Sequence, residues 1–379
     1  MNKLLDDAFA KVSANIKSDL QSAHHVVIGM DCWSRKSLTA SYLAISASFF
    51  HTSHHEPVHV LLNLCQISHP HTGDMLGDIL TGTLEKWNIS KNQVLMVVTD
   101  NGSNMIRAVK VANETTEDDN EPQLSDSIED NDDDEAEEDD AADQEIQSVL
   151  ESFAESCQLT RFPCIAHTLQ LVIKELTKNQ AYRNLLAKVK DLVKCIRCSS
   201  VAQEQLISVC GKTVLKDCST RWNSVLMMFQ RLLSIRTELE SVLKTMKRDS
   251  LSNTEWARLD ELHRLLLPFR EQTDILQTDT MSLSAVIPSL LELSLHLSDQ
   301  SLPKQYSQQL YTSLWQRFSI FLNPSSADFN PLPAAACYLD PTVSAFMKRE
   351  DTMQLLSAAK TYIKLKVNFH SQCSKSRVT

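Results

Sequence analysis

Hydrophobic and polar positions divide the chain into a strand-rich first part and a helical second part. Three runs, 24–33, 39–50 and 57–68, are β-rich and are separated by short polar breaks. Three successive strands with short connections predict an antiparallel meander. Apolar residues at helical spacing then predict a helix over 72–90, and the apolar run 94–98 predicts a fourth strand.

The helix before the fourth strand allows that strand to pair in parallel with an earlier one, through a right-handed crossover. We expect another helix from Ser103, a helix around 146–153 and a short strand or turn at 161–167. Beyond residue 180 the apolar positions recur at helical spacing, and we expect helices only. Three antiparallel strands followed by parallel additions predict an α/β protein with a ribonuclease H-like core.

Composition separates residues 111–147 from the rest of the chain. This stretch holds 18 Asp and Glu and no Lys or Arg, and we predict a disordered acidic insert. The whole chain has 37 basic and 48 acidic residues, so the part outside the insert carries a net charge of +7. A basic body with an acidic segment fits a nucleic-acid-associated protein or a protein that binds basic partners. A merely solubilising segment is the alternative.

Several classes of protein find no support in the sequence. No apolar run of about 18 residues is present, which excludes a transmembrane helix, and residues 1–22 are an amphipathic helix carrying acids rather than a signal peptide. Ten cysteines without a secretory signal indicate reduced thiols in the cytosol or nucleus. Neither a glycine-rich phosphate loop nor a G-x-S-x-G motif occurs, so nucleotide hydrolysis and serine esterase chemistry are excluded.

Two aspartates occupy the strand positions where chemistry is expected. Asp31 follows "VVIGM" in the first strand, and Asp100 ends the fourth. If these strands are parallel neighbours, both carboxylates emerge side by side, which is the oxygen-rich environment that Mg²⁺ prefers. The alternative is that Asp100 caps the turn made by Asn101 and Gly102.

Five sequence blocks, in order, carry a family resemblance. They are "DCWSRKSLTASYLAISASFF", "VVTDNGSNM", "FPCIAHTLQLVI", "STRWNSVLMMFQRL" and "AAACYLDP". Together they resemble the transposases of the hAT superfamily, and in particular its domesticated branch, the zinc-finger BED (ZBED-type) proteins. The resemblance implies a ribonuclease H-like core that is interrupted by an all-helical insertion domain.

The resemblance also implies domain ranges and roles for individual residues. Asp31 and Asp100 match the first two acids of an Asp-Asp-Glu metal site, and Arg221 and Trp222 match a pair placed near a flipped base. The alternative for Trp222 is an ordinary core position. The expected ranges are an N-terminal helix at 1–22, core at 23–110, the acidic insert at 111–147, core at 148–180, the helical insertion at 181–330, and a truncated C-terminal part of the core at 331–379.

No residue of this sequence matches the third acid of the family, its BED finger or its C-terminal dimerisation segment. We therefore predict a nuclear, DNA-binding regulatory protein without strand-transfer activity, with at most a weak Mg²⁺ site at Asp31 and Asp100. Its oligomeric state is left open. One alternative is an active metal-dependent transposase or nuclease that recruits Glu261 or Glu271. Another is a protein-interaction scaffold whose acidic segment holds basic partners.

Two further groups of residues have the spacing of metal ligands. Cys164-x-x-His167 and Cys195-x-x-Cys198 together could form a Cys₃His zinc site, but both pairs lie in apolar runs, and we predict packing roles instead. The histidines between residues 51 and 71 surround an expected hairpin tip, and we assign them no metal.

A row of basic residues lies further along the chain, at Arg183, Lys188, Lys190, Lys194 and Arg197. It is either a solvated surface or a face toward DNA.

Overall fold

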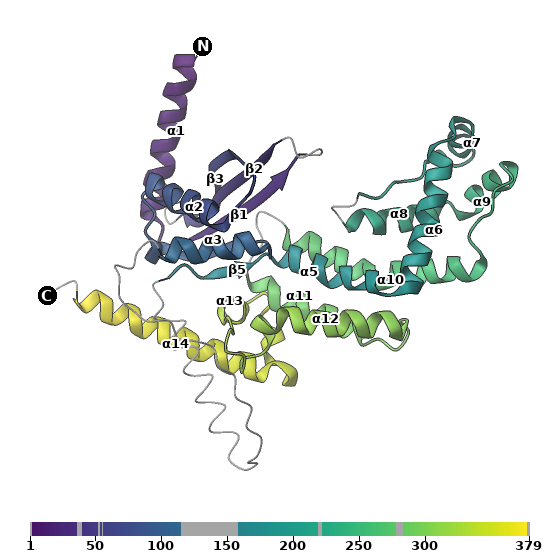
Figure 1. Ribbon diagram of the computed structural model, residues 1–379. Coiled ribbons are helices and arrows are strands. Elements are labelled where there is room, and N and C mark those ends of the chain that lie inside the picture. Colours follow the sequence, from purple (N-terminus) through teal and green to yellow (C-terminus); the bar gives the residue numbers. More distant parts are fainter. Residues whose placement is uncertain are drawn as a thin grey trace. The chain divides into compact units, whose positions relative to one another are not determined.

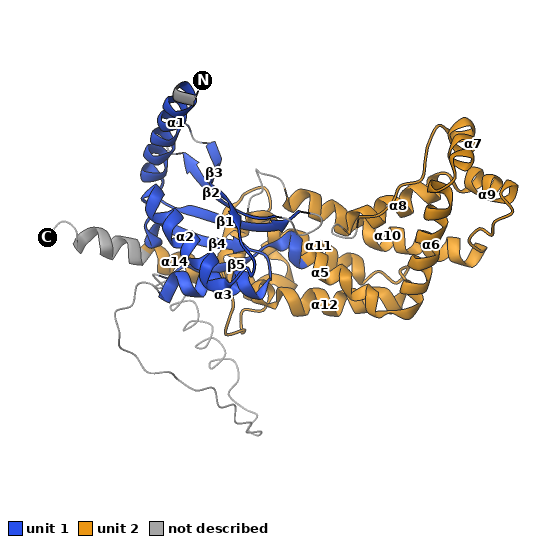
Figure 2. Ribbon diagram, turned by 45° about the horizontal axis from the view of Figure 1, so that its top comes forward, with its two compact units in different colours: residues 1–168 blue, residues 169–379 orange. Residues whose placement is uncertain are grey.

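The chain is described here from a computed structural model, which covers residues 2–35, 40–51, 54, 56–114, 158–218, 222–277 and 283–376. It divides into two compact units, residues 1–168 and residues 169–379 (Figure 2). The first unit is a mixed α/β body built on one sheet, and the second is helical. None of the helices in the described ranges is long and apolar enough to cross a membrane.

A five-stranded sheet forms the centre of the first unit (Figure 1). Its strand order is β3-β2-β1-β4-β5; the first three strands pair antiparallel, whereas β4 joins β1 and β5 joins β4 in parallel. The strands are β1 (Val26–Ser34), β2 (Ser41–His51), β3 (Glu56–Ile67), β4 (Val94–Thr99) and β5 (Arg161–Pro163). The predicted meander and the parallel fourth strand are therefore confirmed.

Helices of the first unit cover one face of this sheet. Alternate residues of β1 and β2, from Val26 and Leu43 onward, are buried together with the apolar faces of α2 and α3. That alternation follows from the strand period of two, which points the intervening residues to the opposite face. The helices are α1 (Asn2–Ser22), α2 (Gly73–Trp87), α3 (Ser103–Glu114) and α5 (Ile165–Lys174), the last of which continues into the second unit.

Helices α2 and α3 approach closely at Gly77. A Cβ atom built on Gly77 would lie 2.8 Å from the carbonyl oxygen of Ala108 and 2.9 Å from Cβ of Val111. The glycine is therefore required by the backbone of the neighbouring helix. Gly82, five residues later in α2, has no atom within 4 Å of the same constructed position.

The predicted start of the acidic insert at residue 111 is wrong. Helix α3 continues to Glu114, and both Val111 and Ala112 are buried in it. The side chain of Asn113 also exchanges hydrogen bonds of 2.8 and 3.1 Å with the backbone of Leu159. The apolar spacing of α3 thus extends four residues past the boundary that acidic composition had suggested. The rest of the predicted insert, and the helix expected around 146–153, lie outside the described residues.

The regular elements of the second unit are helices throughout its described part, apart from a single bridge residue at Cys218, as predicted from its apolar spacing. Residues 332–376, predicted to be a truncated part of the core, are also helical and group with this unit. Its helices are α6 (Gln180–Arg197), α7 (Ser200–Cys210), α8 (Asn223–Ser234), α9 (Arg236–Thr245), α10 (Asn253–Leu276), α11 (Val286–Leu297), α12 (Lys304–Leu322), α13 (Leu332–Leu339) and α14 (Met353–Ser376).

Candidate functional site

The two aspartates lie at equivalent positions of neighbouring parallel strands. Gly29 of β1 is the partner of Val98 of β4 in the parallel ladder. Asp31 follows Gly29 by two residues and Asp100 follows Val98 by two, so both fall at the same end of the sheet and on the same face. This is the face opposite the core, since Met30 and Thr99 between them are buried.

Asp100 also organises the turn after β4. Its Oδ1 accepts a hydrogen bond of 2.9 Å from the backbone N–H of Gly102. This is an Asx turn, in which a short carboxylate replaces a backbone acceptor. The capping role that the sequence offered as an alternative is therefore confirmed, and it engages one of the two carboxylate oxygens.

Arg161 is the central side chain of this site, and the sequence reasoning did not identify it. Its Nε donates to Thr99 Oγ1 at 2.8 Å, and its Nη2 donates to the carbonyl oxygen of Asp100 at 2.7 Å and to Asn101 Oδ1 at 2.6 Å. Partial burial lowers the pKa of the Arg161 guanidinium, whereas the nearby charge of Asp100 raises it. The guanidinium therefore ties the end of β4 to the start of β5.

Polar contacts join the same turn to α5. Asn101 Nδ2 donates to Thr168 Oγ1 at 3.0 Å, and that hydroxyl donates to the carbonyl oxygen of Cys164 at 2.9 Å. The backbone N–H of Cys164 bonds the carbonyl oxygen of Thr99 at 2.7 Å. The turn that begins at Asp100 is thus held by Arg161 of β5, by Cys164 directly before α5 and by Thr168 in α5.

Two thiols in this unit, Cys32 and Cys164, have raised pKa values. Burial raises the pKa of Cys164; hydrogen bonds from the amides of His167 and Ala166 oppose the change, and the charges of Asp31 and Asp100 add to it. Burial, followed by Asp100 and Asp31, likewise raises the pKa of Cys32. The packing role predicted for Cys164 stays a prediction.

The residues considered for zinc are divided between the two units. Cys164 and His167 belong to the first unit, whereas Cys195 and Cys198 lie at the end of α6 in the second. Within the ranges that the structure covers, no group of three or more His, Cys, Asp or Glu side chains could hold a metal ion. Among the residues that this search covers, Asp31 and Asp100 are not joined by a third ligand.

The histidines around the β2–β3 hairpin have protein partners. His51 Nε2 lies 3.4 Å from Asp19 Oδ1, and His59 Nδ1 lies 2.8 Å from Ser48 Oγ. His69 Nε2 lies 3.3 Å from Ser41 Oγ. These contacts join β2 to α1, to β3 and to the segment that follows β3.

The residues predicted to contact nucleic acid lie in the second unit. Trp222 immediately precedes α8 and is half-buried, and Arg221 lies outside the described residues. The basic row on α6 is partly neutralised, because Lys188 pairs with Glu255 at 2.8 Å and Lys190 pairs with Asp217 at 2.7 Å. These two lysines are therefore less available to phosphate than their sequence pattern indicates.

Comparisons with known proteins agree with this arrangement. Residues 29–125 match the family model described as the ZBED1 RNase-like domain, and residues 162–265 match the ZBED1 RNase-like helical domain. The human zinc finger BED domain-containing protein 4 is 26% identical over 133 residues, which cover 33% of this chain and 11% of that protein. Both matched ranges contain blocks from which the resemblance was predicted. The chain therefore belongs to the ZBED-like proteins, domesticated descendants of hAT-superfamily transposases.

Proposed function

We propose that this chain is a nuclear, DNA-associated regulatory protein whose ribonuclease H-like sheet retains two acids of a former metal site but carries out no strand transfer. The parallel pairing of β1 with β4, which sets Asp31 and Asp100 side by side, is the observation that supports this origin most directly. The strand order, three antiparallel strands extended by two parallel ones, fits a ribonuclease H-like core.

The donor set fits one weakly held divalent cation. Two carboxylates supply oxygen ligands of the kind that Mg²⁺ prefers, and the bound ion would attract a phosphate oxygen. One oxygen of Asp100 is engaged by Gly102, and the guanidinium of Arg161 interacts with the same acid. A second ion, which phosphoryl transfer in two-metal sites requires, finds no third acid among the described residues.

Binding to DNA should depend steeply on salt and on the acidic segment. We expect a 30-base-pair duplex to bind the chain weakly, and deletion of residues 115–147 to tighten binding by about tenfold or more at low salt. The reason is charge, because this segment opposes a basic body. Fluorescence anisotropy at several salt concentrations measures both effects. The deletion spares Glu114, so that α3 stays complete.

Failure of the shortened chain to bind DNA at low salt would remove DNA from the proposal. A deletion that leaves DNA affinity unchanged but abolishes capture of a basic histone-tail peptide would instead favour the scaffold alternative. Each result therefore selects one partner class.

We expect no metal-dependent nicking of supercoiled DNA by this chain in Mg²⁺ or Mn²⁺. The alternative of an active nuclease rests on the same acid pair and would need a further acid; the candidates Glu261 and Glu271 both lie on α10. Nicking that disappears in both Asp31→Asn and Asp100→Asn, but persists in the exposed control Asp78→Asn, would establish an enzyme and overturn the proposal.

A further inference from the structure

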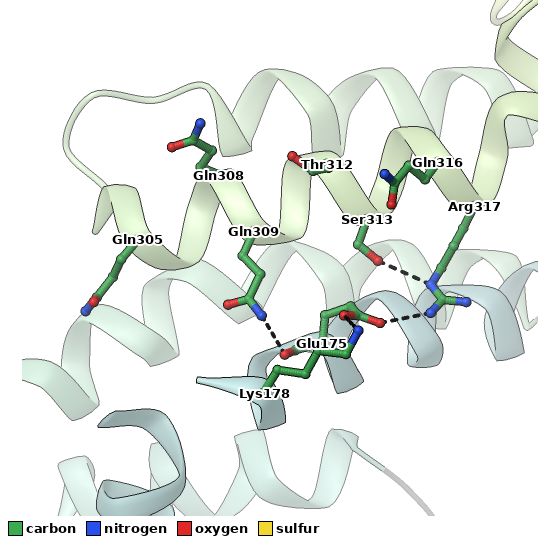
Figure 3. Close-up of a pocket in the computed structure, with 9 residues that line it drawn as sticks. All are labelled: Glu175, Lys178, Gln305, Gln308, Gln309, Thr312, Ser313, Gln316 and Arg317. Carbon is green, nitrogen blue, oxygen red and sulfur yellow. Dashed lines mark hydrogen bonds and ion pairs between the residues drawn. The ribbon is translucent and has the colours of Figure 1, made fainter. Parts of the chain in front are cut away.

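The second unit contains an open groove that the DNA-associated function does not use. It lies between the short 3₁₀ helix at Glu175–Lys178 and α12, and its volume is about 680 Å³ (Figure 3). All nine residues that line it are polar or charged by type. Most of the lining comes from uncharged amide and hydroxyl side chains of α12.

The base of the groove is held by internal hydrogen bonds. Gln309 Nε2 donates to the carbonyl oxygen of Glu175 at 2.7 Å, and Arg317 Nε donates to Ser313 Oγ at 3.2 Å. The Gln309 bond fixes α12 against the 3₁₀ helix, whereas the Arg317–Ser313 bond lies within α12, as Figure 3 shows. The two sides of the groove are therefore held together by hydrogen bonds.

A row of four side chains on α12 has no such partner. Gln305, Gln308, Thr312 and Gln316, which we call the amide row, are all exposed and line the groove. None of these four side chains forms a hydrogen bond with another residue in the described part of the chain. A Gln side chain carries both a donor and an acceptor, as a peptide group does, and a Thr hydroxyl can serve as either.

The spacing of the amide row suits an extended polymer. Steps of three or four residues along a helix advance about 4.5 to 6 Å, and an extended chain repeats its outward groups every two residues, roughly 6.6 Å. From Gln305 to Gln316 the row spans about 16 Å, the length of about five extended residues. Successive side chains can therefore reach successive peptide groups of one strand.

Charge at one end of the groove adds a preference. Glu175 accepts from Lys178 Nζ at 2.6 Å and from Arg317 Nη2 at 2.9 Å, so two cations share one carboxylate. The hydrogen bond from Lys178 lowers the pKa of Glu175 most; partial burial opposes it, and Arg317 lowers it further. Glu175 is thus ionised at neutral pH, and the trio keeps a net charge of +1.

These properties favour a peptide over a nucleic acid. A phosphate backbone is bound chiefly by cations, and aromatic stacking is the usual complement for single strands. The groove offers two cations, whose charge Glu175 reduces to a net +1, and no aromatic lining residue, which suits one carboxylate better than a row of phosphates. Neutral amides match a peptide backbone instead.

We propose that this groove binds an extended peptide segment, whose backbone pairs with the amide row and whose acidic side chain lies at Lys178 and Arg317. The proposal is independent of DNA binding by the chain. Its occupant is a segment of another protein that offers unpaired backbone groups and at least one carboxylate.

The test uses the full chain and a fluorescein-labelled nonapeptide of alternating Glu and Thr, compared with one of alternating Lys and Thr. We expect the acidic peptide to bind, and Gln308→Ala/Gln316→Ala to weaken it by about tenfold or more. The matched control, Gln230→Ala/Gln354→Ala, changes exposed glutamines on α8 and α14 and should leave binding unchanged.

Three results would overturn the proposal. They are equal affinity for the two peptides, equal loss in both double variants, and no saturable binding up to about 1 mM peptide. A labelled 12-nucleotide single strand, measured in parallel, separates the remaining alternative. If Gln308→Ala/Gln316→Ala weakened binding of that single strand but not binding of the peptide, the groove would be assigned to nucleic acid.

Discussion

Replacing Gly77 by valine is expected to lower the free energy of unfolding of the first unit by about 3 kcal/mol. The new Cβ would meet the backbone oxygen of Ala108 at 2.8 Å and Val111 Cβ at 2.9 Å, and neither can move without shifting α3. The two helices would have to separate and expose part of the core. Hydrogen–deuterium exchange of peptides from α2 and α3 should become roughly a hundredfold faster.

The matched control is Gly82→Ala in the same helix. Its Cβ would meet nothing within 4 Å, and the position is exposed, so the substitution should stabilise α2 by about 0.5 to 1 kcal/mol through helix propensity. If Gly77→Val left exchange as slow as this control does, the close approach of α2 and α3 would be contradicted.

Replacing Arg161 by alanine should have the second largest effect. Its three hydrogen bonds join Thr99, Asp100 and Asn101 to β5, and bonds that involve a charged group contribute about 1.5 to 3 kcal/mol. We expect a loss of about 2 to 3 kcal/mol and faster exchange at 97–102 and 161–168. Arg161→Lys should rescue little, because an ammonium cannot reproduce the planar fork that reaches three acceptors.

Arg183→Ala provides the control for Arg161. Arg183 is also hydrogen-bonded, to the carbonyl oxygen of Thr177 and to Gln180, but it is exposed, so its removal should cost less than about 0.5 kcal/mol. Equal effects of the two alanine substitutions would show that Arg161 does not hold the acid turn.

The sheet could be predicted because its signals are local. The strand runs of the meander and the run 94–98 show their strand character within a few residues, and the helix at 73–87 between them implies a parallel crossover. The neighbouring positions of Asp31 and Asp100 follow from that topology. Their metal role stays a prediction.

The parts that could not be predicted depend on contacts between distant residues. The function of Arg161 needs the pairing of Val97 with Arg161 between β4 and β5, which no spacing in the sequence reveals. The pairing of Lys188 with Glu255 joins residues that are 67 positions apart, and it neutralises part of the positive charge of the basic row on α6. At α3, composition competed with periodicity: Val111 and Ala112 continue the apolar face of the helix, although acidic residues follow at once.

The acid pair also bears on the order in which the protein forms during synthesis. Strands β1, β2 and β3 pair with their sequence neighbours, and β4 follows by residue 99, whereas Arg161 emerges from the ribosome about sixty residues later. Until then, Asp31 and Asp100 repel each other without the guanidinium beside them. During synthesis the sheet therefore acquires its fifth strand and the positive charge of Arg161 together, after the other four strands have been made.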